Sequence, residues 1–145
     1  MKIYAESSAV LAWLLREPAA EAVRDTFAAA ELVIASDLTL VECDRVLIRA
    51  ALTGEIPELD AARRRALLEK TAAHWHLLRV DRDVVERTRR PFPGEPLRTL
   101  DAIHVASAVT ARQALPGLAM LSLDQRVRES AAGLGMRVVP APAPA

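Results

Sequence analysis

The chain has few aromatic residues, a single cysteine and no long apolar run, and each shortage excludes a class of protein. Aromatic residues make up 3% of the 145 residues, so the core must be built from Leu, Val, Ile and Ala. The single cysteine, Cys43, cannot form an intramolecular disulfide and is expected to be a buried thiol in a reducing compartment. No stretch is long and apolar enough for a signal peptide or a membrane span, so we expect a cytoplasmic protein without membrane association.

The chain also lacks an excess of charge of either sign. Its 19 basic and 19 acidic residues give a formal net charge of zero, so any binding of nucleic acid must come from a local basic patch. Glycine is scarce, with five residues, while Ala and Leu are plentiful, which favours helices. Hydrophobic residues make up 52% of the chain, enough for one globular domain with a sizeable core.

Short apolar runs alternate with helical patterns along the sequence. The runs predict five strands, at residues 2–5, 32–36, 76–80, 118–122 and 136–139. Helical patterns fill most of the intervals, and the Pro-rich stretch 90–98 predicts a loop. Strands that alternate with helices indicate an α/β protein with a parallel sheet covered on both faces. We expect one domain over residues 1–139 and a disordered Pro/Ala tail over 140–145.

Four acidic residues stand where predicted strands end or helices begin. They are Glu6, Glu42, Asp101 and Asp124. Because parallel strands end at the same edge of a sheet, these carboxylates can converge there. Such a cluster needs a cation, and oxygen ligands without histidine or thiol suit Mg²⁺ or Mn²⁺, which activate water for phosphodiester cleavage. The alternative, that the four are helix caps and solvated charges, stays open at this point because the chain has 19 acids.

Serines, arginines and a histidine accompany these acids. Ser8 is expected to bond a metal-bound water or a phosphate, or only to cap the first helix, as Ser7 also can; Ser122 is expected to orient Asp124 or simply to end its strand. Four arginines around the Pro-rich loop are candidates for holding phosphates near the metal, with a solvated charge run as the alternative; they are Arg87, Arg89, Arg90 and Arg98. His104 is expected to be bonded within the fold rather than to bind a metal, and Thr99 to cap its helix.

Four segments carry a family resemblance. They are "IYAESSAVLAWLLREP", "SDLTLVECDRVLIRA", "LRTLDAIHVASAV" and "LSLDQRVRESAAGLGMRVV", in this order. Together they resemble the PIN domain, and within that family the VapC-type ribonuclease toxins of type II toxin–antitoxin systems. The resemblance extends to about Val139, and it implies a PIN domain over 1–139. The implied fold is a three-layer α/β/α sandwich with a central parallel sheet of four or five strands.

The resemblance also implies an activity and partners. The activity is that of a Mg²⁺- or Mn²⁺-dependent endoribonuclease, in which Glu6, Glu42, Asp101 and Asp124 form the catalytic and metal-binding quartet. We expect Glu6 and Asp101 to hold the ion chiefly, and Glu42 and Asp124 to complete its shell or orient the attacking water. The implied partners are a cognate VapB-type antitoxin, whose C-terminal segment lies in the active-site groove, an RNA substrate and a second copy of the chain in a homodimer. The first two helices, with Trp13, are expected to offer a groove for apolar side chains of the antitoxin.

Position 6 departs from the family pattern. The first acid of the family is almost always Asp, and here it is Glu6. The extra methylene shifts the carboxylate by about one bond length, and a displacement of ~1 Å can cost ~100-fold in rate. A compensating backbone, a preference for Mn²⁺ and an attenuated enzyme are all open explanations. The alternative function is therefore a catalytically weakened PIN-fold binding module that acts through antitoxin or RNA binding.

Overall fold

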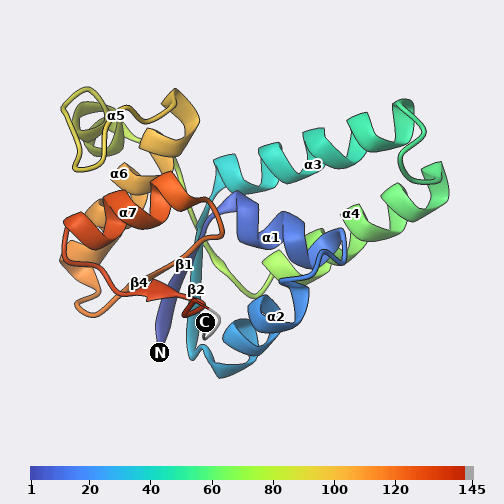
Figure 1. Ribbon diagram of the computed structural model, residues 1–145, viewed down its shortest axis with the longest axis horizontal. Coiled ribbons are helices and arrows are strands. Elements are labelled where there is room, and N and C mark those ends of the chain that lie inside the picture. The colour runs from blue at the N-terminus through green and yellow to red at the C-terminus, as the bar shows by residue number, and fades with distance from the viewer. Residues whose placement is uncertain (143–145) are drawn as a thin grey trace.

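The computed structural model describes residues 1–142 and shows a five-stranded, fully parallel sheet with the strand order β3-β2-β1-β4-β5 (Figure 1). The strands are β1 (Lys2–Ala5), β2 (Leu32–Ser36), β3 (His76–Leu78), β4 (Ala119–Leu121) and β5 (Val138–Val139). In the centre of the sheet, Tyr4 of β1 is in register with Ile34 of β2 and Met120 of β4. The chain therefore leaves β1 at the middle of the sheet edge, and Glu6 follows there.

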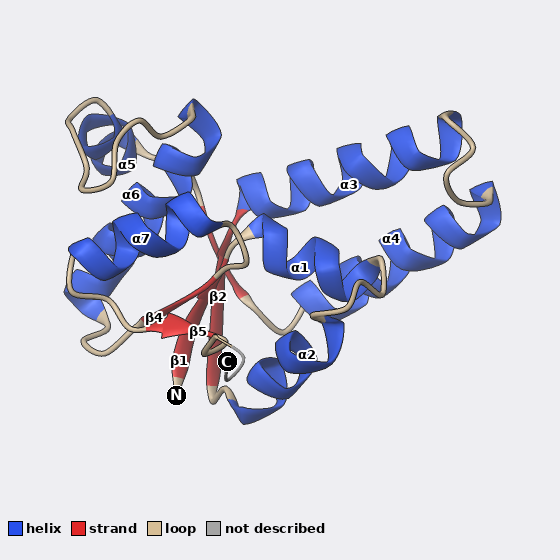
Figure 2. Ribbon diagram, in the orientation of Figure 1, coloured by secondary structure: helices blue, strands red, loops and turns tan. Residues whose placement is uncertain are grey.

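Helices cover both faces of this sheet (Figure 2). Within residues 1–142 they are α1 (Ser7–Leu14), α2 (Ala20–Ala29), α3 (Asp37–Leu52), α4 (Glu58–Ala72), α5 (Arg82–Thr88), α6 (Thr99–Ala114) and α7 (Gln125–Gly133). Buried residues of α1 to α4 pack in one core, and those of α5 to α7 pack in a second core on the opposite face. This arrangement confirms the predicted three-layer α/β/α sandwich.

The central strand explains why both faces are covered. Ile3 and Ala5 point into the first core and Tyr4 into the second, and all three are fully buried. Side chains alternate between the faces of a strand, so a strand that is apolar at every position requires cover on both sides. Cys43 is also fully buried in the first core, and burial raises the pKa of its thiol, in agreement with the structural role expected for it.

Several boundaries differ from the prediction. The strands β3, β4 and β5 are shorter than expected, because backbone pairing ends before the apolar runs do. A serine does not cap α1; Glu6 does, since its longer side chain folds back to accept the Ser8 N–H. Thr99 is the first residue of α6 rather than its cap, because the chain is still extended at Arg98.

Two further predictions concern the ends of the fold and the membrane. Of the tail predicted over 140–145, residues 143–145 lie outside the described residues, and the tail stays a prediction. Within residues 1–142, none of the helices combines the length and the hydropathy that a membrane crossing requires.

Two leucines on α3 provide a matched test of the core. Leu47 is fully buried, whereas Leu52 is 82% exposed. We expect Leu47→Ala to lower the free energy of unfolding by about 2–5 kcal/mol, because it leaves a cavity in the core. Leu52→Ala should change it by less than about 0.5 kcal/mol. Urea unfolding followed by circular dichroism measures both values, and equal losses would contradict this packing.

Candidate active site

Glu6 lies at the carboxyl end of the central strand, and its carboxylate is held by serines. Its Oε1 accepts the Ser8 backbone N–H at 3.1 Å, and its Oε2 accepts the Ser122 hydroxyl at 2.7 Å and the Ser8 hydroxyl. Glu6 itself is only 3% exposed. The carboxylate therefore caps α1 and joins it to the end of β4.

The two serines have a second set of bonds on the other side. The Ser8 Oγ accepts the backbone N–H groups of Leu123 at 2.9 Å and Asp124 at 3.1 Å. The Ser122 Oγ also accepts the Asp124 N–H at 3.1 Å. Ser8 and Ser122 thus connect the Glu6 carboxylate to the backbone of Asp124, and they accommodate the longer side chain at position 6.

Asp101 and Asp124 come together through a cation of the chain itself. The Arg98 Nε donates to Asp101 Oδ2 at 3.0 Å, and the Arg98 Nη2 lies 3.5 Å from Asp124 Oδ2. Asp124 is also the N-cap of α7, where its Oδ1 accepts the N–H groups of Arg126 and Val127. One oxygen of Asp124 is therefore committed to the helix, and the other faces the guanidinium that it shares with Asp101.

Glu42 belongs to a buried network with His104. The His104 Nε2 bonds the Glu42 carboxylate, and the Nδ1 lies 2.8 Å from the Tyr4 hydroxyl. Since a carboxylate only accepts, Nε2 carries the proton, and in a neutral ring Tyr4 donates to Nδ1. Ser7 donates to Glu42 Oε1 at 2.7 Å. The fully buried His104 is thus bonded within the fold, as the sequence predicts.

This network shifts the ionisation of two of its members. Burial by itself raises the pKa of Glu42, but the hydrogen bonds from His104 and Ser7 outweigh it, so that the pKa is lowered below its usual value. Burial raises the pKa of Tyr4 far above its ordinary range. The Tyr4 hydroxyl therefore stays protonated, and Glu42 stays ionised at neutral pH.

The structure links three of the four acids in pairs rather than in one tight cluster, and Glu42 bonds separately to Ser7 and His104. Glu6 and Asp124 are joined through Ser8 and Ser122, and Asp101 and Asp124 through Arg98. Among residues 1–142, no group of three His, Cys, Asp or Glu side chains lies close enough to hold a metal ion. The donor chemistry nevertheless fits Mg²⁺, which is often held by one or two carboxylates and several waters, since Asp101 and Asp124 already attract a cation.

The four arginines have different surroundings. Arg98 lies among the acids, whereas the Arg87 guanidinium lies 3.9 Å from the centre of the Phe92 ring and donates to two carbonyls of the loop before α6. Arg89 and Arg90 are exposed. Their contacts with RNA phosphates stay predictions.

Sequence reasoning did not find the parts played by Tyr4, Ser7 and Arg98. The only signal for Arg98 was its spacing of three residues from Asp101, which places both on one side of a helical turn. Ser7 was expected only as a cap, and nothing in the sequence pairs Tyr4 with His104, because their contact depends on how α6 packs on the sheet.

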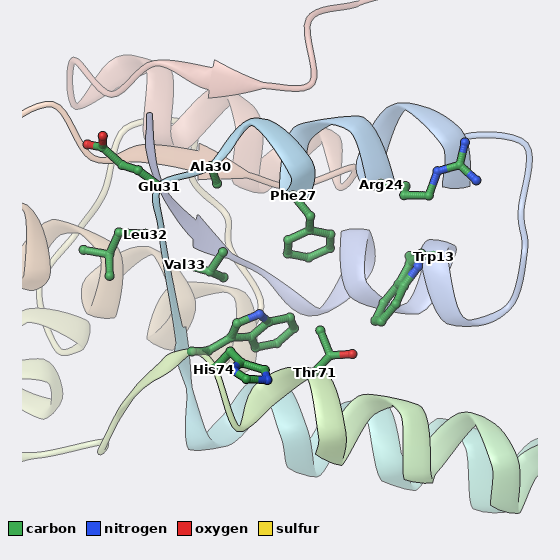
Figure 3. A pocket seen from close by; sticks show the side chains of 10 residues that line it. Trp13, Arg24, Phe27, Ala30, Glu31, Leu32, Val33, Thr71 and His74 are labelled. Atoms are coloured by element: carbon green, nitrogen blue, oxygen red, sulfur yellow. The ribbon is translucent and has the colours of Figure 1, made fainter.

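An aromatic pocket lies at the opposite edge of the sheet, where β2 begins. It has a volume of about 330 Å³, and its lining includes Trp13, Phe27, Val33 and Trp75. Phe27 stacks on Trp75 at 5.4 Å and meets Trp13 edge-to-face at 5.8 Å. Figure 3 shows Trp13 and Phe27 on α1 and α2 facing Thr71 and His74 at the end of α4. The chain thus has an apolar pocket separate from the acids.

The lowered pKa of Glu42 leads to a prediction about how the free energy of unfolding depends on pH. Because its pKa is lower in the folded protein than the unfolded value of about 4.3, its contribution is complete above that value and is lost as pH falls through the folded pKa. Chemical unfolding of the metal-free protein should therefore show a smaller loss of stability from about pH 7 to about pH 3 in Glu42→Gln than in wild type. The exposed Glu17→Gln controls for the lost charge, and identical pH profiles of wild type and Glu42→Gln would contradict the network.

Comparison with known proteins places the chain in a family. Residues 3–133 match the PIN domain. Ribonuclease VapC46 of Mycobacterium tuberculosis is 36% identical over 137 residues, which cover 94% of this chain and 95% of that protein.

Solved structures show the same fold at lower sequence identity. FitAcB from Neisseria gonorrhoeae superimposes with a TM-score of 0.71 at 17% identity, covering 95% of this chain and 96% of that one. A toxin–antitoxin complex from Klebsiella pneumoniae gives a TM-score of 0.64 at 15% identity, with 97% of each chain covered. Together with the match over nearly the whole sequence, these results show that the chain belongs to the PIN domain family and groups within it with proteins named ribonuclease VapC.

Proposed function

We propose that the protein is a metal-dependent endoribonuclease and the toxin of a type II toxin–antitoxin pair. The observation that carries the proposal is that Asp101 and Asp124, from different helices, share one cation at the carboxyl edge of the parallel sheet. That edge is where ligands bind in open α/β sheets. The relationship to VapC46, a ribonuclease by name, supports RNA as the substrate.

Asp101 and Asp124 are the residues that would hold Mg²⁺ or Mn²⁺, with Glu6 and Glu42 beside them. A bound divalent ion would supply an activated water and would stabilise the charge on the leaving oxygen. The carboxylates keep their places through their neighbours: Ser7 and His104 fix Glu42, and the α7 N-terminus fixes Asp124. The exposed guanidinium of Arg98 is our candidate for binding an RNA phosphate.

The apolar pocket supports an antitoxin as partner. Trp13, Phe27 and Trp75 form a concave aromatic surface that suits the apolar side chains of a partner helix or strand. The pocket lies at the opposite sheet edge from the acids, so its occupant need not cover the Asp101–Asp124 pair. We also propose that the protein forms a homodimer, as the sequence resemblance implies.

One observation favours a second candidate function, a binding module with weakened catalysis. Both oxygens of Glu6 accept hydrogen bonds from the protein, Oε1 from the Ser8 N–H and Oε2 from the Ser8 and Ser122 hydroxyls. If the position has lost its role towards the metal, the fold would act through antitoxin or RNA binding alone.

The main proposal is tested by cleavage of RNA. Wild type with Mn²⁺ or Mg²⁺ should cleave single-stranded RNA and leave 5′-phosphate and 3′-hydroxyl ends, and EDTA should abolish the activity. Asp101→Asn should lower the rate by about 100-fold or more, because the oxygens that attract the cation lose their charge. Asp44→Asn, at an exposed aspartate that pairs with Arg65, is the matched control and should keep the wild-type rate. Cleavage that persists in EDTA would refute the proposal.

Position 6 separates the two candidate functions. Glu6→Asp should cleave no faster than wild type, because Ser8 and Ser122 already hold the longer carboxylate, and the shorter side chain loses the reach to Ser122. An in vitro RNA cleavage assay at matched protein concentration measures the ratio of the Glu6→Asp rate to the wild-type rate. An increase of about tenfold or more, which corresponds to about 1.4 kcal/mol in the barrier, would instead favour the weakened binding module.

A further inference from the structure

Arg98 occupies a helix position at which a cation is unfavourable. It is the N-cap of α6, with φ −68° and ψ 156°, and its side chain accepts no backbone hydrogen bond. Ser, Thr, Asn and Asp are preferred there because they satisfy the free N–H groups of the first turn. The positive end of the helix dipole also repels a guanidinium. Other groups must therefore hold Arg98 in place.

The surrounding acids supply that attraction. The Nε and Nη2 of Arg98 approach the Oδ2 atoms of Asp101 and Asp124. The hydrogen bond to Asp101 raises the pKa of Arg98, and the negative charges of Asp101, Asp124 and Glu42 raise it further. Arg98 thus pairs with two of the four candidate metal ligands, and it neutralises part of their charge.

The backbone of Arg98 is fixed, but its side chain is free to move. Glu95 accepts the N–H groups of Phe92 and Leu97, and Arg126 donates to the Pro96 carbonyl at 2.6 Å, which braces the loop before α6. The Arg98 side chain is 78% exposed, against 9% for its partner Asp101. Exposed ion pairs contribute little to stability, so the guanidinium can rotate into solvent without unfolding the loop.

A divalent ion would compete with this guanidinium. Both cations would be held by the carboxylates of Asp101 and Asp124, and two cations at neighbouring positions repel each other. We propose that Arg98 is a built-in counter-ion of the Asp101–Asp124 pair in the metal-free protein, and that a divalent ion displaces it. The released guanidinium then binds a phosphate of the RNA. This inference rests on the metal site of the proposed function and adds a regulatory step to it.

Metal binding measured without RNA tests the competition. Mn²⁺ titrations followed by electron paramagnetic resonance give the dissociation constant at low ionic strength for wild type, Arg98→Gln and Arg45→Gln. Arg98→Gln should bind Mn²⁺ about fivefold or more tightly than wild type, a coupling of ordinary size. Arg45→Gln removes the same charge from an exposed side chain one turn of α3 after Glu42, without removing a contact to either aspartate, and it should gain less than about twofold.

A second measurement follows the guanidinium itself. In the metal-free protein, NMR should resolve the Arg98 Nε–H signal, identified by its absence in Arg98→Gln, because this group is hydrogen-bonded to Asp101. Saturating Mg²⁺ should move the signal to the position typical of a free arginine. Arg98→Lys keeps the charge but lacks the Nε–H donor, and its Mn²⁺ affinity should lie between those of wild type and Arg98→Gln.

The outcomes separate this inference from the proposed function. If wild type binds Mn²⁺ and cleaves RNA while the Arg98 signal stays unchanged in Mg²⁺, the displacement is refuted and the nuclease assignment stands. Equal Mn²⁺ affinities of Arg98→Gln and Arg45→Gln also refute it, because general charge removal then accounts for the gain. If neither wild type nor Arg98→Gln binds Mn²⁺, both the metal site and the inference are refuted.

Discussion

The structure depends on how negative charge is balanced at the carboxyl edge of the parallel sheet. The topology ends all strands in one direction, so acids that follow strands or begin helices are brought to one place. Each has its own solution: Glu6 accepts serine hydroxyls, Asp124 caps a helix, Asp101 pairs with Arg98, and Glu42 bonds to His104. Since burying a charge without partners is costly, these bonds are a condition for folding as well as for any chemistry at the edge.

The two edges of the sheet differ in character, and the difference suits the two proposed interactions. The carboxyl edge is polar, with ionised groups held by hydrogen bonds. The amino edge of β2 borders a pocket of three aromatic rings in contact, a large share of the few aromatic residues in the chain. A polyanion is recognised by charge and a protein partner by apolar area, so the fold keeps the two kinds of recognition on separate surfaces.

The layers and the sheet could be predicted because buried parallel strands are visible as apolar runs between helical patterns. The same reasoning brought Glu6 and Asp124 to the ends of β1 and β4. It did not predict how the carboxylates are bonded, because these bonds join residues far apart in the chain. The bond of Glu6 to Ser122 and the approach of Arg98 to Asp124 both depend on β4 and the start of α7 reaching the same edge of the sheet as β1 and α6. Packing between elements, rather than local pattern, decides such pairs.

The bonding around Glu6 has a consequence for how this sequence can change over generations. Its carboxylate accepts hydrogen bonds from the hydroxyls of Ser8 and Ser122. These hydroxyls also accept backbone N–H groups of the loop that follows β4. Shortening the acid withdraws the acceptor of these hydroxyls, and removing Ser8 leaves the Leu123 N–H without its partner. Drift at this position is therefore expected to be concerted, with glutamate and its serines inherited together as a unit that single substitutions disfavour.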